Sequence, residues 1–507
     1  MLGFITNRGF LTGRGFGGLR RMLRRRFDAI RVLDLRGDSQ GTRRATVPTD
    51  ENVFNIQVGV CILIAYATGA KPEHAEAEVS YADAWEEGAF TRADKLTLAS
   101  TAAADPARLR YRPVAGRDMD PLKPAGFDGT DWPGVDELLT FRSNGIVTYR
   151  DEFVYATTRP ALATRIQNWL RLSPEEASAR FKETRDRKAG PALRLGFDES
   201  AIERVSYRPL DARFLYNRRE FVDFPKRALQ DAWGPENVAL MALEDGTGAG
   251  PAVWCHGLKP DQHTFRGSYG GWVFPLRNHS AESRGHFFAP NLVGRLAANY
   301  GEPVPPLDIF DAILALLSAS SYTIRFAFDL EDDFPRVPFP ADREVFGEAV
   351  LLGTRIRELE GFGPSRGAGF RSARLIGRAS GATMDVPSPQ RAFMGADSTG
   401  SVALLSDRSL VMTGIAERVW RFEISGYAVL YRWLRARNGE PITGPSGAAL
   451  LREALDIAWR IAELLDLFDR ADAVLARALE APLTRADLDL PGRDAVSVPR
   501  HDEDEPG

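Results

Sequence analysis

The first fold prediction depends on the stretch GFITNRGFLTGRGFGGLRRMLRRRFDAIRVLDL, residues 3–35. Gly13–Gly18 has the G-x-G-x-x-G spacing of a dinucleotide-binding loop, and Asp34 follows about one βαβ unit downstream. In that fold the first glycine comes directly after the strand, so that the backbone reaches a pyrophosphate. Here the segment Asn7–Gly13 intervenes. We therefore favour a glycine-rich loop that opens a helix, and keep a nucleotide-binding oxidoreductase that uses Gly13–Gly18 as a minor alternative.

Four elements are expected in the first seventy residues. They are a strand at Leu2–Thr6, a helix at Phe16–Phe27, a strand at Ile30–Leu35 and a mostly apolar strand at Val58–Tyr66. The apolar side of the helix carries Leu19, Met22, Leu23 and Phe27, and its other side carries Arg20, Arg21, Arg24, Arg25 and Arg26. We expect the arginine side to face solvent, with DNA contact as the alternative.

The order of these elements predicts an antiparallel pair. No helix-length segment separates the second strand from the third, whereas a parallel connection needs a crossover of about a dozen residues or more. An α/β sheet that ends in an antiparallel pair is typical of S-adenosylmethionine-dependent methyltransferases. We therefore predict an α/β fold containing only the last strands of an incomplete methyltransferase sheet.

Composition limits the possible functions. The chain has 507 residues and a net charge of −4, so any binding to nucleic acid must come from local basic patches. Two cysteines, Cys61 and Cys255, exclude a disulfide scaffold and fit a reducing cytoplasm. No apolar run reaches membrane-spanning length without a charge, and no cluster has zinc spacing. We expect a cytoplasmic protein without a bound metal.

The rest of the chain predicts a large α+β region ending in helices. Strands are expected at Ile146–Tyr155, Val238–Leu243 and Gly271–Phe274, and helices at Leu307–Leu317 and within Val419–Leu479. The expected domains are a methyltransferase-like part at 1–125, a DNA target-recognition domain at 126–490 and a disordered acidic tail at 491–507.

Several clusters along the chain resemble one family. They are ENVFNIQVGVCILIAYA (51–67), SNGIVTYRDEFV (143–154), SYRPLDARFLY (206–216), FPKRALQ (224–230), DFPRVPFP (333–340) and GYAVLYRWLRAR (426–437). In this order they resemble the methyltransferase and specificity region of type ISP restriction-modification enzymes, from about residue 2 to about residue 437. The resemblance implies N6-adenine methylation of double-stranded DNA with S-adenosylmethionine, and phage defence.

The sequence departs from the family pattern in one respect. No Asn-Pro-Pro-Tyr or Asp-Pro-Pro-Tyr motif occurs, and the cofactor-binding glycine motif of the family would lie further upstream still. We therefore expect that this chain cannot methylate alone and that a separate polypeptide supplies the missing half. The alternative is a non-catalytic DNA-binding specificity subunit or a gene remnant.

Two residues are candidates for the pocket of the target base. Phe54 matches the position where related adenine methyltransferases place an aromatic ring against the flipped base, and Asn7 follows the first strand. Each residue also has a structural explanation, since Phe54 could enter a strand as a core residue and Asn7 could start a turn.

Basic and aromatic residues predict the DNA contacts. The candidates are Tyr149, Arg150, Arg208, Arg213, Arg218, Arg219, Lys226 and Arg227. They could neutralise phosphates, and a fixed arginine could read guanine. The alternative for Arg150, Arg208 and Arg213 is a buried arginine–aspartate pair that braces a turn, and Asp211 is expected to be structural in either case. A mobile basic loop at 355–378 is a further candidate.

Overall fold

The structure is a computed structural model. It describes residues 1–13, 16–37, 50–72, 75–124, 131–265, 270–280, 284–327, 329–331, 333–363, 365, 368–378, 383–395 and 399–490. The chain divides into two compact units: unit 1 comprises Met1–Thr130 with Phe326–Asp333, and unit 2 comprises Asp131–Arg325 with Phe334–Gly507. Gly15 of the glycine motif and the predicted acidic tail at 491–507 lie outside the described residues.

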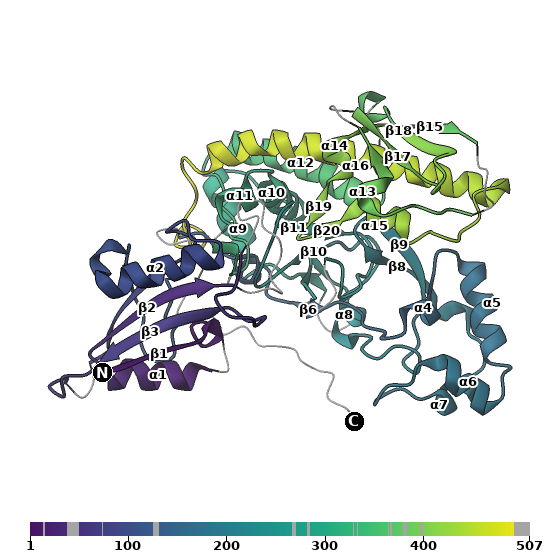
Figure 1. Ribbon diagram of the computed structural model, residues 1–507. Helices are drawn as coiled ribbons and strands as arrows, with labels where there is room; N and C mark the ends of the chain where they lie inside the picture. Colours follow the sequence, from purple (N-terminus) through teal and green to yellow (C-terminus); the bar gives the residue numbers. More distant parts are fainter. Residues whose placement is uncertain are drawn as a thin grey trace. The chain divides into compact units, whose positions relative to one another are not determined.

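Unit 1 is built on one mixed sheet (Figure 1). Its strands are β1 (Leu2–Asn7), β2 (Ala29–Arg36), β3 (Val60–Tyr66), β4 (Glu78–Asp83) and β5 (Arg112–Val114), and its longer helices are α1 (Gly17–Arg26) and α2 (Arg92–Ala104). The strand order is β1-β3-β2-β4-β5. Strand β3 is antiparallel to both β1 and β2, whereas β2 and β4 are parallel. The predicted antiparallel pairing of the second and third strands is therefore confirmed.

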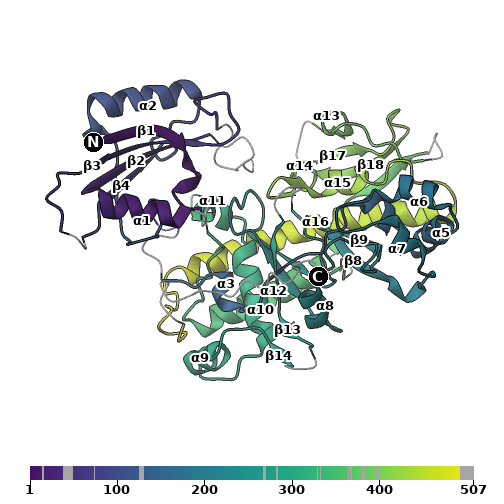
Figure 2. The same ribbon diagram turned by 90° about the horizontal axis from the view of Figure 1, so that it is seen from below.

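Helices α1 and α2 cover opposite faces of this sheet (Figures 1 and 2). On the α1 face, Leu23 packs with Ile30 of β2 and Leu63 of β3. On the other face, Leu98 of α2 packs against a cluster that includes Leu33 of β2. The alternation along β2 thus supplies both cores, as expected for a strand that is covered on two sides.

The predicted orientation of α1 is wrong for two of its arginines. Arg20 and Arg24 are buried, whereas Leu19 and Met22 are exposed. Arg20 donates hydrogen bonds to the carbonyl oxygens of Phe10 and Gly13, at 3.0 and 2.7 Å. The guanidinium groups stay buried because their donors are bonded to carbonyl oxygens of the protein. The turn before α1 is therefore braced by the protein's own guanidinium, which supports the interpretation as a loop that opens the helix.

Strand β1 lies at the edge of the sheet and exposes apolar side chains. Among the described residues its only partner in the sheet is β3. Leu2, Phe4 and Ile5 are all exposed, Ile5 to 50%. Ile64 of β3 is exposed as well, so the mostly apolar third strand is not buried along its whole length.

Unit 2 contains several small sheets surrounded by helices. Its sheets are β11-β10-β12-β6, β7-β9-β8, β15-β18-β17-β16, β13-β14 and β19-β20. Their strands are β6 (Ser143–Asn144), β7 (Tyr155–Ala156), β8 (Ile202–Arg208), β9 (Asp211–Tyr216), β10 (Ala239–Ala242), β11 (Val253–His256), β12 (Trp272–Pro275), β13 (Arg277–Asn278), β14 (Gly285–His286), β15 (Arg374–Gly377), β16 (Phe393–Met394), β17 (Thr399–Ala403), β18 (Leu410–Ala416), β19 (Glu423–Ile424) and β20 (Tyr427–Ala428).

Two groups of helices in unit 2 pack closely. The helices described in this unit are α3 (Val135–Leu138), α4 (Asp151–Val154), α5 (Arg159–Trp169), α6 (Pro174–Phe181), α7 (Ala189–Leu193), α8 (Arg227–Ala232), α9 (Leu292–Tyr300), α10 (Pro306–Ser318), α11 (Tyr322–Arg325), α12 (Arg343–Glu360), α13 (Pro389–Ala392), α14 (Glu417–Trp420), α15 (Val429–Arg435) and α16 (Gly444–Ala478). Helices α10, α12 and α16 pack on one another, and α5, α6 and α7 share a core with β8 and β9. No helix in the described ranges is both long and apolar enough to cross a membrane.

The sequence predictions for unit 2 were met unevenly. The expected elements near β10, β12 and α10 are confirmed. The strand expected at Ile146–Tyr155 is wrong, because this segment forms isolated bridges followed by α4. The basic loop expected at 355–378 is also wrong in part, since Arg355 and Arg357 belong to α12 and pair with Glu463 and Asp311.

The buried arginines of α1 give a direct test of the fold. We predict that Arg24→Met destabilises the protein by about 1–3 kcal/mol, because the carbonyl oxygens of Gly116 and Pro121 lose their donor. The matched control is Arg25→Met, whose exposed ion pair with Asp118 contributes no more than about 1 kcal/mol. Urea denaturation measures both free energies of unfolding. Equal stability of the two variants would contradict the buried position of Arg24.

Candidate nucleic-acid interface

Three adjoining loops of unit 2 carry four cations and one exposed tyrosine; three of the cations are exposed and Lys226 is half-buried. The first loop precedes α4 and carries Tyr149, the second follows α6 and carries Lys182 and Arg185, and the third carries Lys226 and Arg227 at the start of α8. We call these five residues the three-loop surface. All three loops rest on one core, in which Val154, Phe181, Phe221 and Val222 are buried together.

The buried side chain of Arg150 joins the three loops. Its Nη1 donates to the carbonyl oxygen of Phe221 at 2.7 Å and lies 2.6 Å from a carboxylate oxygen of Asp223. Its Nε donates to the carbonyl oxygen of Phe181 at 3.2 Å, and its Cζ lies 4.6 Å from the centre of that ring. The guanidinium is therefore occupied by the protein itself. This arrangement fits the structural alternative to DNA contact for Arg150, a buried arginine–aspartate pair that braces a turn.

Further contacts fix the loops to one another. Arg187 donates to the carbonyl oxygens of Val222 and Asp223, each at 2.8 Å, and so ties the second loop to the third. Val147 and Phe224 exchange backbone hydrogen bonds of 3.1 and 2.9 Å, which tie the first loop to the third. Each loop thus has its backbone held by contacts inside the protein.

A residue with a left-handed backbone occurs in each loop. The φ angles are +52° at Tyr149, +54° at Lys182 and +58° at Lys226. Such conformations cost a residue with a Cβ atom about 1–2 kcal/mol, and they concentrate at functional sites. The clamp of Arg150 gives a physical reason why the strain persists, because the backbone next to it cannot relax without breaking buried hydrogen bonds.

The cations of the surface are accessible to a large anion. The side chains of Arg185 and Arg227 are 81% and 87% exposed. They form exposed ion pairs with Asp186 and Asp231, which are weak and exchangeable in water. Tyr149 is 53% exposed, and its ring meets Phe224 edge-on with 6.0 Å between ring centres.

A second predicted cluster lies in the hairpin of β8 and β9 and is mostly buried. The guanidinium groups of Arg208 and Arg213 lie over the ring of Tyr207, at 3.9 and 4.1 Å from its centre. Arg208 also donates to Asp261 at 2.7 Å. Arg213 pairs with the buried Asp211 at 2.9 Å. The hairpin is therefore braced by its arginines, which again fits the structural alternative.

Two more predicted DNA contacts lie beside the third loop. Arg218 is partly buried and donates to the carbonyl oxygen of Gly196 at 3.3 Å, whereas Arg219 is exposed. Of the two, Arg219 can reach a ligand without losing an internal hydrogen bond. Both remain predictions as DNA contacts.

The predicted base-pocket residues lie at one end of the sheet of unit 1. Asn7 ends β1 and pairs in register with Val60, and Phe54 belongs to the loop that leads into β3. The Asn7 side chain accepts a hydrogen bond from the Gly9 amide at 2.7 Å and caps the short helix at Arg8–Phe10. Phe54 is exposed rather than buried, as stacking on a base would require. Both assignments remain predictions.

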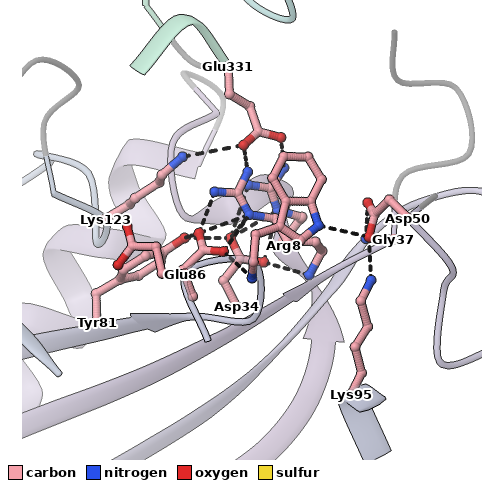
Figure 3. Close-up of polar contacts among 12 residues, drawn as sticks. Arg8, Asp34, Gly37, Asp50, Tyr81, Glu86, Lys95, Lys123 and Glu331 are labelled. Carbon is pink, nitrogen blue, oxygen red and sulfur yellow. Dashed lines mark hydrogen bonds and ion pairs between the residues drawn. The ribbon is translucent and has the colours of Figure 1, made fainter. Parts of the chain in front are cut away.

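The same end of the sheet holds a network of ion pairs (Figure 3). Ligands of open α/β sheets bind at the carboxyl ends of the strands, so this network occupies a place where a site is expected. Arg8 binds both oxygens of Asp34 at 3.0 Å, and the hydroxyl of Tyr81 donates to Asp34 at 2.8 Å. Arg36 binds Asp83 at 2.9 Å.

Glu331 completes this network from a distant part of the sequence. It pairs with Arg36, with Arg8 at 3.6 Å and with Lys123 at 3.9 Å. Burial by itself would raise the pKa of Asp34, but the ion pairs with Arg8 and Arg36 outweigh it and hold that pKa well below its usual range. The Asp34 carboxylate therefore stays charged and serves as an internal counter-ion. Within the described residues no group of three or more His, Cys, Asp or Glu side chains could hold a metal ion.

Sequence reasoning missed the second loop of the surface. Lys182, Arg185, Arg187 and Lys188 follow α6 in the stretch KETRDRK, residues 182–188. A run in which most residues are charged is a recognisable signal of an interaction surface. It was overlooked because nothing local in the sequence shows that Phe181 lies next to Arg150.

The clamp can be tested by a pair of variants in the same surface. We predict that Arg150→Met destabilises the protein by about 3–5 kcal/mol, because Asp223 is left as a buried charge without its partner. The control, Arg185→Met, removes an exposed cation and should change stability by less than about 0.5 kcal/mol. Chemical denaturation provides both values. A small effect of Arg150→Met would show that the loops do not depend on this guanidinium.

The chain was compared with known proteins at the level of sequence families and of structures. The family model described as Type ISP C-terminal specificity domain matches residues 137–456. No curated protein sequence matches the chain. This family match encloses all three loops of the candidate interface.

Several solved structures share the fold. The ATP-dependent Type ISP restriction-modification enzyme LlaBIII bound to DNA has a TM-score of 0.63 and 16% identity, with 92% of this chain and 32% of that chain covered. The DrdV–DNA complex has a TM-score of 0.61 and 18% sequence identity, and the match covers 95% of this chain and 50% of that chain. A nuclease-deletion mutant of the Type ISP restriction-modification enzyme LlaGI, in complex with a DNA substrate mimic, has a TM-score of 0.61 and 18% sequence identity. The match covers 92% of this chain and 39% of that chain.

This chain therefore spans half or less of the length of these three similar structures. Because the sequence identity to these structures is below 20%, the structural likeness shows only a shared fold. The family model, in contrast, matches more than half of the chain's 507 residues. The chain belongs to the family of Type ISP C-terminal specificity domains.

Proposed function

We propose that this chain recognises a target sequence in double-stranded DNA and that the three-loop surface is part of its DNA-binding face. The observation that carries the proposal is the family match over residues 137–456, which contains exposed cations on loops with clamped backbones. The structural neighbours LlaBIII, DrdV and LlaGI were each solved with DNA or a DNA mimic. Nucleic acid is thus the ligand that best fits this surface.

The mechanism of binding follows from charge and geometry. Lys182, Arg185, Lys226 and Arg227 would contact phosphates and position the duplex, without reading its sequence. Because Arg185 and Arg227 already hold exposed carboxylates, a phosphate would replace a weak ion pair with a stronger contact. The net charge of the chain is −4, so the attraction is local and should weaken steeply with salt.

Salt dependence tests this assignment. We predict that Lys226→Gln and Arg227→Gln each weaken binding to random duplex DNA and each reduce the slope of log K against log salt concentration by about 1, because each removes one phosphate contact. The control is Arg295→Gln, an exposed cation on α9 elsewhere in unit 2. Fluorescence anisotropy with labelled duplex libraries gives the slopes.

The control and the two variants have distinct expected results. Arg295→Gln should retain the wild-type slope. If all three variants behave alike, the three-loop surface is not the DNA-binding face. If the wild-type chain binds no duplex at any salt concentration, target recognition by this chain is refuted.

We further propose that unit 1 supplies the last strands of an N6-adenine methyltransferase sheet and that a separate polypeptide completes it. Among the residues that the structure describes, no strand pairs with the outer edge of β1. Apolar side chains lie on both faces of β1, and α1 adds the exposed Leu19 and Met22. Such an edge is a template for another strand. Asn7 and Phe54 would then lie at the base pocket, next to the junction with the added strands.

The described residues offer no fit for S-adenosylmethionine. The carboxyl end of the sheet is filled by the ion pairs of Arg8, Asp34, Arg36 and Asp83. Asn-Pro-Pro-Tyr, the motif that would hold the target amine, is absent from the sequence. We therefore assign the cofactor to the completing polypeptide and derive no step through it.

A substitution on β1 separates this proposal from a chain that only binds DNA. We predict that Ile5→Lys prevents association with a neighbouring-frame polypeptide that carries Asn-Pro-Pro-Tyr, because the added part would cover this face of β1 and bury the charge. Leu351→Lys, at a site 73% exposed on α12, should have no effect. Sedimentation of the mixture and transfer of a labelled methyl group to duplex DNA measure the outcome. Association that survives Ile5→Lys would contradict the edge assignment, and DNA binding without methylation in the mixture would favour the non-catalytic alternative.

A further inference from the structure

Phosphate contact does not explain Tyr149. Its side chain is 53% exposed, although its left-handed backbone, with φ of +52°, favours glycine or asparagine. An exposed aromatic residue in a strained conformation lowers stability, and a lysine or serine would serve a phosphate equally well. The ring must therefore serve a contact that needs an aromatic face.

The neighbours of Tyr149 hold its ring in place. The planes of the Tyr149 and Phe224 rings lie at 80° to each other, with 6.0 Å between the ring centres. About half of the Tyr149 side chain stays accessible to solvent beside this contact. The next residue, Arg150, is buried and bonded to two other segments, so the loop cannot swing the ring away without breaking those bonds.

Two cations of the third loop lie close to the ring that packs against Tyr149. Nζ of Lys226 lies 5.3 Å from the centre of the Phe224 ring, the same ring that supports Tyr149. The exposed Arg227 follows in sequence. An aromatic face beside such cations is the arrangement by which proteins bind unstacked nucleotides, with the ring on the base and the cations on the phosphates.

We propose that Tyr149 stacks on a nucleobase of the bound DNA that has lost a neighbour in its own stack. The inference rests on the proposed DNA-binding function and adds a role to it: the surface binds distorted DNA in preference to regular duplex. Stacking of this kind is tolerant of sequence, because every base has a π face. Tyr149 therefore positions and stabilises a distortion, while base identity is read elsewhere.

The test uses the full chain and two duplexes of equal length, one fully paired and one with a single unpaired 2-aminopurine. The wild type should bind the second duplex at least about fivefold more tightly, which corresponds to one base–aromatic stack. Its binding should also quench the fluorescence of the unpaired 2-aminopurine. Tyr149→Phe keeps the ring and should retain both effects.

The variant that removes the ring is Tyr149→Asn, since asparagine tolerates the left-handed backbone and the fold is kept. It should bind both duplexes with equal affinity and leave the fluorescence unquenched, with an unchanged melting temperature as evidence of folding. Lys226→Gln should weaken binding to both duplexes by the same factor and keep the preference.

Each outcome decides between the two proposals. If Tyr149→Asn retains the preference and the quenching, or if the wild type binds duplex DNA but shows neither effect, the stacking role is overturned and DNA recognition stands. If the wild type binds neither duplex, the proposed function itself fails, and the stacking role fails with it.

Discussion

The buried guanidinium of Arg150 is the interaction on which the candidate interface depends. It donates hydrogen bonds to carbonyl oxygens of two segments that are far apart in sequence, and it forms an ion pair with Asp223. Three loops are therefore fixed around one planar group. A planar cation with several donors suits this task, since it can satisfy several acceptors at once. The left-handed residues of the loops are tolerated because the clamp overdetermines their backbone. The surface can therefore present exposed cations and an aromatic ring in a fixed arrangement, which reduces the entropy lost on binding.

Unit 1 buries a network of charges at one end of its sheet and exposes several apolar side chains of β1 and α1. Its ion pairs around Asp34 and Arg36 are satisfied internally, whereas Ile5 and Met22 face outward. Soluble proteins rarely leave an unpaired strand edge and apolar side chains together without a partner. The proposed completion of the sheet by further strands would give both features one explanation. The order β1-β3-β2, with β3 antiparallel to its neighbours, is consistent with the end of a sheet rather than its middle.

Much of unit 1 could be predicted from local sequence, and most of the interface could not. The elements α1, β2 and β3 follow from periodicity and from the missing crossover helix. The burial of Arg20 and Arg24 could not be predicted, because a helix with arginines on one side normally turns that side to water. Likewise, the sequence around Tyr149 and Arg150 indicates a functional segment but not which side chain points outward. That outcome depends on contacts with Phe181 and Phe221, which are distant in sequence.

Hydrogen exchange of the full chain, with and without saturating duplex DNA, tests most directly whether the three clamped loops of unit 2 bind DNA as one surface. We expect the amides of residues 147–151, 181–188 and 221–227 to exchange more slowly in the presence of DNA, all three segments together, because the clamp makes them one surface. Unchanged exchange in these segments, with protection confined to other parts of the chain, would contradict the account.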